Sequence, residues 1–174
     1  MLTTLAIVML IAAACTAGMF LLSFTSSSPA DLGVRDGRLA KCPNSPNCVS
    51  TQAEDRDHWI APLTIQKNSA NAIEVLEGIV RRLPRTEIVE KSPTYLRAEF
   101  RSPFFRFVDD VEFYLEPESE RIHMRSASRV GRSDLGVNRA RIEKIRGLFQ
   151  ATQPALTTPQ VLPANSGALL PVRL

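Results

Sequence analysis

The chain has 174 residues, a length typical of one domain, and its 21 basic and 18 acidic side chains leave a formal net charge of +3. The basic residues are scattered, with one adjacent pair at Arg81-Arg82, so no basic stripe or patch is available to follow a nucleic-acid backbone. This composition excludes nucleic acid as the first choice of partner.

The N-terminal segment, residues 1–24, is predicted to be a membrane anchor. Leu2 to Phe24 contains no charged residue and as a helix would span about 30 Å of hydrocarbon. A cleavable signal peptide normally has a basic start and a shorter apolar stretch, so we expect residues 2–24 to stay in the cell membrane as a single pass. Two alternatives are cleavage near Ser28-Pro29-Ala30, which would release a secreted protein, and lipid modification of Cys15.

Two cysteines bear on the compartment. Cys42 and Cys48 enclose the turn-rich spacer Pro-Asn-Ser-Pro-Asn, which favours a disulfide and therefore a domain on the periplasmic or extracytoplasmic side. Free thiols or a metal site are alternatives, but zinc-binding cysteines are usually closer together, and we predict no metal site and no cofactor. In contrast, Arg35, Arg38 and Lys41 follow the apolar segment and favour a cytoplasmic C-terminal side.

Composition divides the remaining chain into three parts. Residues 25–38 are rich in Ser, Gly, Asp and Arg and are predicted to be a linker. Residues 39–149 are expected to form a single domain. Residues 150–174 are rich in Pro, Thr and Ala with a single charge at Arg173, and we expect this tail to be disordered.

Two helices are predicted within the domain. The first has apolar residues at helical spacing from Ile73 to Leu83, possible caps at Asn68 and Ser69, and Pro84 as a stop. In the last helix Ile142, Ile145 and Phe149 recur on one side, and Asn138 or Asp134 is its expected cap.

Strands are predicted between these helices, at Thr86–Glu90, Tyr95–Arg101, Asp110–Glu116 and Arg121–Ser128. The last two form a hairpin, in which unpaired turn residues 117–120 place Leu115 opposite Ile122, Phe113 opposite Met124 and Glu112 opposite Arg125. The order of elements indicates an α+β domain, with an antiparallel sheet of about four strands and helices packed on its apolar face.

The other face of the hairpin carries a polar group that could perform chemistry. Asp110 and Glu112 point to the same side of one strand, and with His123 they could serve as acids and bases of a hydrolase or isomerase. The simpler interpretation is that Glu112 pairs with Arg125 on a solvated sheet face.

The stretch that follows the hairpin is a candidate anion site. Arginines and serines surround a glycine-containing loop that leads into a helix start, and such groups suit phosphate or carboxylate. The expected partner is an anionic small molecule or a lipid headgroup; the alternative is a capped surface loop held by ion pairs. The candidate ligand-binding residues are Arg125, Ser126, Ser128, Arg129, Arg132, Ser133, Asn138 and Arg139, with Asp110 and Glu112 beside them.

Three ordered motifs, Cys42–Ser50, Phe107–Phe113 and Arg125–Arg139, together resemble the domain-of-unknown-function 1499 (DUF1499) family. The resemblance covers about Leu39 to Phe149. It implies a protein that is exported or attached to a membrane, and it implies no established activity and no catalytic residues.

The sequence therefore favours a non-enzymatic binding or accessory module at a membrane. Two alternatives stay open. One is the hydrolase or isomerase based on Asp110, Glu112 and His123. The other is a structural envelope protein whose tail reaches a partner.

Overall fold

The computed structural model describes residues 1–65, 71–117 and 119–152. The possible helix caps Asn68 and Ser69, and residues 153–174 of the expected tail, lie outside this part. In chain order the elements are α1 (Leu2–Thr25), β1 (Cys48–Ser50), β2 (Leu63–Thr64), α2 (Ala72–Arg81), β3 (Thr86–Lys91), β4 (Tyr95–Arg101), β5 (Val108–Leu115), β6 (Arg121–Ser128) and α3 (Val137–Thr152).

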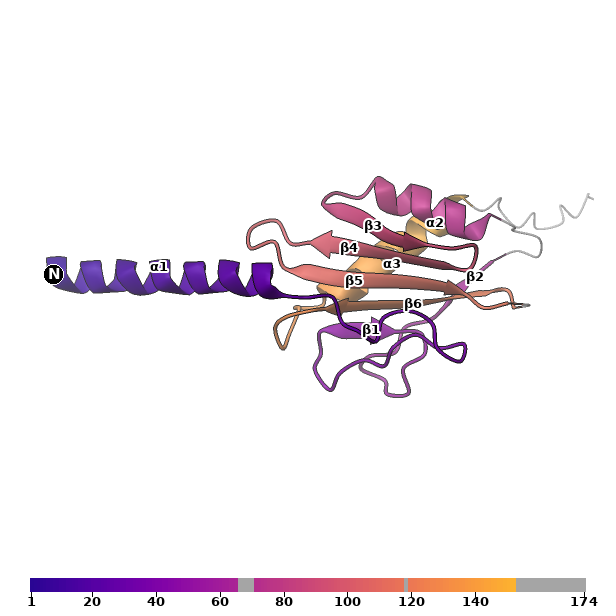
Figure 1. Cartoon of the computed structure of the whole chain (residues 1–174), viewed down its shortest axis with the longest axis horizontal. Coiled ribbons are helices and arrows are strands. Elements are labelled where there is room, and N and C mark those ends of the chain that lie inside the picture. Colours follow the sequence, from indigo (N-terminus) through magenta and orange to yellow (C-terminus); the bar gives the residue numbers. More distant parts are fainter. Residues whose placement is uncertain (66–70, 118, 153–174) are drawn as a thin grey trace, which may run out of the picture.

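The strands of the described residues form one antiparallel sheet in the order β1-β6-β5-β4-β3, and β2 also pairs with β6 (Figure 1). Helices α2 and α3 cover one face, which confirms the α+β class. The four expected strands correspond to β3 to β6. The sequence did not reveal β1 and β2 because they have three and two residues, too few to show an alternating pattern.

The predicted register of the β5–β6 hairpin is confirmed. Leu115 lies opposite Ile122, Phe113 opposite Met124 and Glu112 opposite Arg125. Side chains alternate between the two faces of a strand, so this register directs Phe113 and Met124 toward the helices. It directs Glu112 and Arg125 to the other face.

The core lies between the sheet and the two helices. Leu76 of α2 and Ile142, Ile145 and Phe149 of α3 have no exposed surface. Helix α2 ends before Pro84, as the sequence predicted, because proline cannot continue the hydrogen-bond ladder.

Helix α3 is capped by one of the two expected residues. The Asp134 carboxylate accepts the backbone N–H of Asn138 at 2.7 Å, so Asp134 is the cap and Asn138 lies in the first helical turn. The helix continues to Thr152. The first residues of the segment expected as a tail are therefore helical.

Part of the expected linker is packed on the sheet. The backbone N–H of Gly33 donates to Glu112 Oε1 at 2.8 Å, and Val34 packs against a buried cluster that contains Tyr95 and Tyr114. The second face of the sheet is thus covered by chain, and the expectation of a solvated face was wrong. Asp110 and Glu112 on it are 1% and 0% exposed.

Helix α1 extends away from this domain (Figure 1). Its length and apolar composition are sufficient to cross a membrane, and a signal sequence would have the same properties. Ser23 is its one buried residue, whereas side chains such as Leu10 are largely exposed. The apolar surface of α1 is therefore left uncovered by the described part of the domain.

Replacing Phe149 by alanine should lower the free energy of unfolding by about 3–5 kcal/mol, because the ring is fully buried between α3 and the sheet. Denaturant unfolding followed by Trp59 fluorescence measures the change. Leu148→Ala is the matched control, since Leu148 is 41% exposed on the same helix. Equal losses for both variants would contradict the placement of the core.

Candidate functional site

The disulfide predicted from the spacing of the cysteines is confirmed. Cys42 and Cys48 are bonded, with their Cα atoms 5.7 Å apart. Cys48 lies on β1, opposite Ala127 of β6. The bond therefore fastens the segment before β1, which runs beside the polar face, to the edge of the sheet.

Glu112 is at the centre of the polar face. Its Oε1 accepts the N–H of Gly33 and the hydroxyl of Tyr95, both at 2.8 Å, and its Oε2 accepts Arg125 Nη1 at 3.1 Å. Burial and the adjacent Glu112 charge raise the pKa of the Tyr95 hydroxyl, so Tyr95 stays a neutral donor. These three donors satisfy both oxygens of the buried carboxylate.

Asp110, two residues before Glu112 on the same face of β5, is held in a similar way. Arg129 donates to its two oxygens at 2.7 and 2.8 Å, a bidentate contact, and also donates to Glu99. The hydrogen bonds to Asp110 are the main cause of a raised pKa of the Arg129 guanidinium. The charge of Asp110 is thereby balanced within the fold.

Arg125 differs from Arg129 in one respect. It is 5% exposed, and its Nε is buried without a hydrogen-bond partner among the residues that the structure describes. A buried donor left without an acceptor costs about 1–3 kcal/mol. It is an unsatisfied donor on a residue that lines a pocket.

A pocket of about 310 Å³ lies beside Arg125. Its wall includes Asp110 of β5, Arg125 of β6 and Arg129 just after β6. Lys41 and Asp31 come from the covering segment. Three basic side chains thus meet two acidic ones there. Arg129 is paired with Asp110 and Arg125 with Glu112, so Lys41 is the basic side chain of the lining that neither pair uses.

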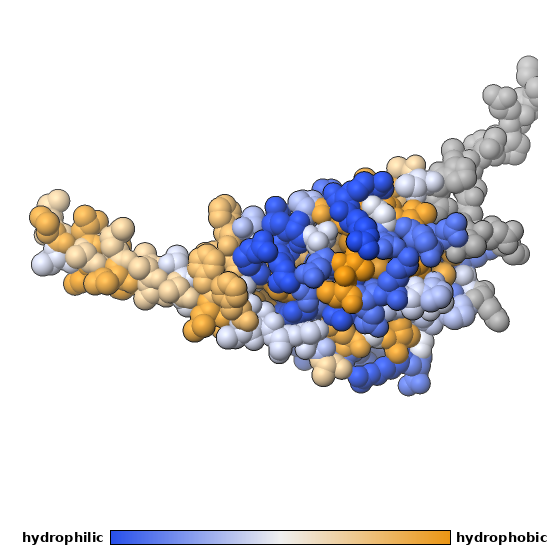
Figure 2. All heavy atoms as spheres, turned by 45° about the horizontal axis from the view of Figure 1, so that its top comes forward, coloured by the Kyte–Doolittle hydropathy of each residue, from blue (hydrophilic) through white to orange (hydrophobic). Residues whose placement is uncertain are grey.

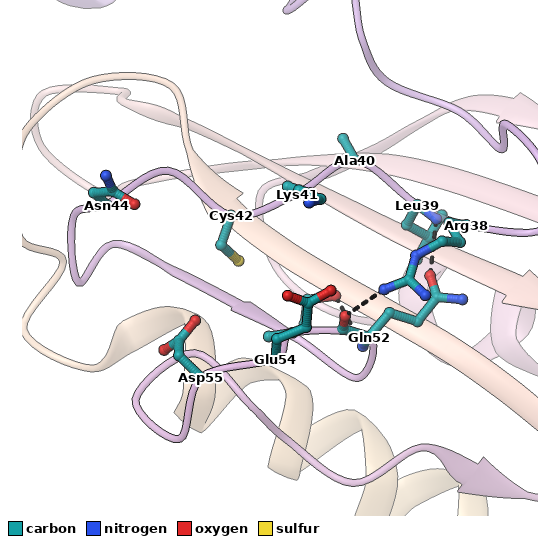
Figure 3. Close-up of a pocket in the computed structure, with 11 residues that line it drawn as sticks. Arg38, Leu39, Ala40, Lys41, Cys42, Asn44, Gln52, Glu54 and Asp55 are labelled. Carbon is teal, nitrogen blue, oxygen red and sulfur yellow. Dashed lines mark hydrogen bonds between the residues drawn. The ribbon is translucent and has the colours of Figure 1, made fainter.

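A second hollow of about 220 Å³ lies on the other side of the same covering segment. Figure 3 shows Arg38 and Lys41 along one wall and Glu54 and Asp55 along the other. Arg38 donates to the backbone oxygen of Gln52 at 3.0 Å, which closes one end. Its balanced charge makes this hollow a weaker candidate for an anion than the pocket beside Arg125.

The structure divides the candidate residues of the sequence between the two faces of the sheet. Arg125, Arg129, Asp110 and Glu112 lie together on the polar face, as described above. Ser126 and Asn138 are fully buried on the helical side, where the Asn138 amide donates to Asn47 O at 2.9 Å and to Ser128 Oγ at 3.0 Å. Ser126, Ser128 and Asn138 therefore connect α3 to the sheet.

The remaining candidates are on the loop before α3 and in its first turn. Arg132 and Ser133 are exposed. Arg139 donates to the backbone oxygens of Trp59 and Asp57, at 3.0 and 2.7 Å, and so fixes a neighbouring loop. The structure does not bring these three residues to the pocket beside Arg125.

His123, the third member of the possible acid–base group, contacts other residues. Its Nδ1 is 3.0 Å from Thr51 Oγ1, its Nε2 is 3.6 Å from Glu116, and its ring stacks on Tyr114. Burial lowers the pKa of this imidazole. Among the described residues, no hydrogen bond joins His123 to Asp110 or Glu112, so the geometry does not favour an acid–base role for the three.

Lys41 and Asp31 are the pocket residues that sequence reasoning missed. Asp31 lies in the expected linker and Lys41 at the start of the expected domain, and no local pattern connects them with β5 and β6. Tyr95 had a signal, because it shares the polar side of β4 with Arg97 and Glu99. Its partner Glu112 could not be read from that alternation alone.

The fold and the site together define a disulfide-stabilised α+β domain with a charged, covered sheet face, joined to an N-terminal apolar helix. Residues 38–149 match the model of a protein family of unknown function, DUF1499. The chain belongs to this family, as its motifs suggested. No curated protein and no solved structure matches the chain.

Glu112→Leu should lower the free energy of unfolding by about 3–5 kcal/mol, because it leaves the buried guanidinium of Arg125 without its counter-charge. The double variant Glu112→Leu/Arg125→Leu should recover much of this loss. Denaturant unfolding of the single and double variants measures the coupling. Additive losses would show that the two charges do not depend on each other.

Proposed function

We propose that this protein is a membrane-anchored binding module that holds a small anion against the polar face of its sheet. In this proposal α1 is the anchor and the disulfide-bonded domain is on the extracytoplasmic side. The ligand occupies the pocket beside Arg125, and the protein itself carries out no reaction.

The unpartnered Nε of Arg125 is the observation that carries the proposal. The remaining charges of the polar face are matched, since Glu112 is held by Arg125 Nη1 and Asp110 by Arg129. An anion in the pocket would accept from the free donor without breaking either pair. Lys41, exposed at the pocket wall, adds a charge that the sheet does not need for its own stability.

The geometry suits a compact phosphate or carboxylate. Guanidinium groups donate in a planar fork that fits two oxygens of such groups, and lysine contributes a point charge. The ligand could be a free metabolite or the headgroup of a lipid, since both present the same chemistry. Asp31 in the pocket wall favours a ligand that also carries a positive or hydroxyl group on that side.

The anion site is tested with inorganic phosphate and with glycerol 3-phosphate, titrated calorimetrically against the full chain in detergent. Lys41→Gln should weaken binding about fivefold, the equivalent of ~1 kcal/mol, without a change in stability. Arg125→Lys should also weaken binding, because it keeps the charge facing Glu112 but removes the Nε donor. Lys144→Gln is the matched control, since Lys144 is an exposed lysine outside this pocket.

The probes distinguish the two sources of ligand. Binding of glycerol 3-phosphate well above that of inorganic phosphate indicates a lipid headgroup, and equal binding indicates a free anion. Loss of affinity in Lys144→Gln equal to that in Lys41→Gln would show nonspecific charge attraction and overturn the assignment of the pocket.

The compartment is tested by labelling Cys42 and Cys48 in intact cells with a membrane-impermeant thiol reagent, in a Cys15→Ser background. We expect labelling only after reduction, because the two sulfurs are bonded and face an oxidising compartment. Labelling without reductant, and only after the cytoplasmic membrane is broken, would place the domain in the cytoplasm. That result would contradict the extracytoplasmic part of the proposal.

A further inference from the structure

Three loops meet at the end of the sheet where α1 joins the domain. Arg101 at the end of β4 pairs with Val108 at the start of β5, so residues 102–107 turn at this end. Ser128 at the end of β6 lies opposite Asp109, which places the β6–α3 loop there as well. Thr86 pairs with Phe100, and the α2–β3 connection therefore ends beside the other two loops.

The β4–β5 loop touches α1. The ring of Phe105 packs edge-on against Phe20, with the ring centroids 5.5 Å apart, and Phe105 also packs against Phe107. Phe20 is five residues before the end of α1 at Thr25, a rise of about 7 Å along a helix. The loop therefore reaches below the end of the apolar helix, to the depth at which interfacial side chains enter a bilayer.

The loops at this end expose apolar side chains. Phe104 is 79% exposed, Leu135 of the β6–α3 loop is 93% exposed, and Val137 at the start of α3 is 51% exposed. Figure 2 shows hydrophobic atoms gathered where α1 meets the domain. A patch of this kind, continuous with an apolar helix, indicates contact with a membrane more than with water.

Basic side chains surround the same end. Arg82 and Arg85 in the α2–β3 connection, Arg106 in the β4–β5 loop and Arg132 in the β6–α3 loop are all exposed. A hollow of about 390 Å³ between α2, α3 and β4 has Pro103 of the β4–β5 loop in its wall, together with apolar residues that include Leu83, Phe100 and Val137. Basic groups around apolar ones match the phosphates and acyl chains of an anionic lipid surface.

We infer that this end of the domain docks on the surface of the bilayer that α1 enters. Phe104 and Leu135 insert among the lipids, and the arginines contact anionic headgroups. The domain is then held end-on against the membrane instead of moving freely on a tether. The inference rests on the proposed anchoring by α1 and is independent of the anion pocket.

The docking is tested with the full chain in lipid vesicles of phosphatidylcholine and phosphatidylglycerol that carry brominated acyl chains. Trp59 is the single tryptophan, and Trp59→Phe gives a silent background. In it, the indole introduced by Phe104→Trp should lose fluorescence to the brominated lipid. The indole introduced by Glu120→Trp, exposed at the opposite end of the sheet, should not.

The outcomes separate the anchor from the docking. A chain that does not float with the vesicles in a density gradient overturns both. A chain that floats but shows no quenching at position 104, or equal quenching at 104 and 120, overturns the docking and leaves the anchor intact.

The charge requirement is tested with Arg85→Gln/Arg106→Gln. This variant should lose the difference in quenching between vesicles with and without phosphatidylglycerol. Lys91→Gln/Arg121→Gln removes the same charge from the opposite end of the sheet and should keep the difference. A loss in both variants would show that net charge, not this surface, draws the domain to the lipid.

Discussion

The buried pair of Glu112 and Arg125 is the constraint on which the polar half of this domain depends. Two charges removed from water are tolerated only when each has partners, and Glu112 obtains the others from Tyr95 and from the backbone of Gly33. The N-terminal segment must therefore fold back over the sheet. One ion pair thus turns an apparent linker into part of the domain.

The disulfide has a complementary effect at the edge of the sheet. It holds the chain before β1 close to β6, so that Lys41 is kept between two hollows on either side of the covering segment. The linings of the two hollows differ, because Arg125 of β6 and Arg129, which follows β6, line one of them only. Covalent closure and ion pairing thus both hold residues of the pocket wall in place.

The two surfaces proposed for binding use different physical effects. The pocket beside Arg125 relies on charge and on an unfilled hydrogen-bond donor in a place shielded from water. The end next to α1 relies on exposed apolar area with basic side chains around it. A module that is held against a bilayer and also binds a polar anion would bring the anion close to the membrane surface.

The sequence by itself determined the apolar helix, the amphipathic α2, the hairpin register and the disulfide, since each depends on residues close together in the chain. It also proposed Arg125, Arg129, Asp110 and Glu112 as candidates, but grouped them with Ser126 and Asn138. Strand alternation places Ser126 on the opposite face, where Asn138 of α3 contacts it. Only the tertiary structure decided what covers the polar face. The contact from Gly33 to Glu112 spans 79 positions, and no local pattern of residues encodes a contact between segments so far apart.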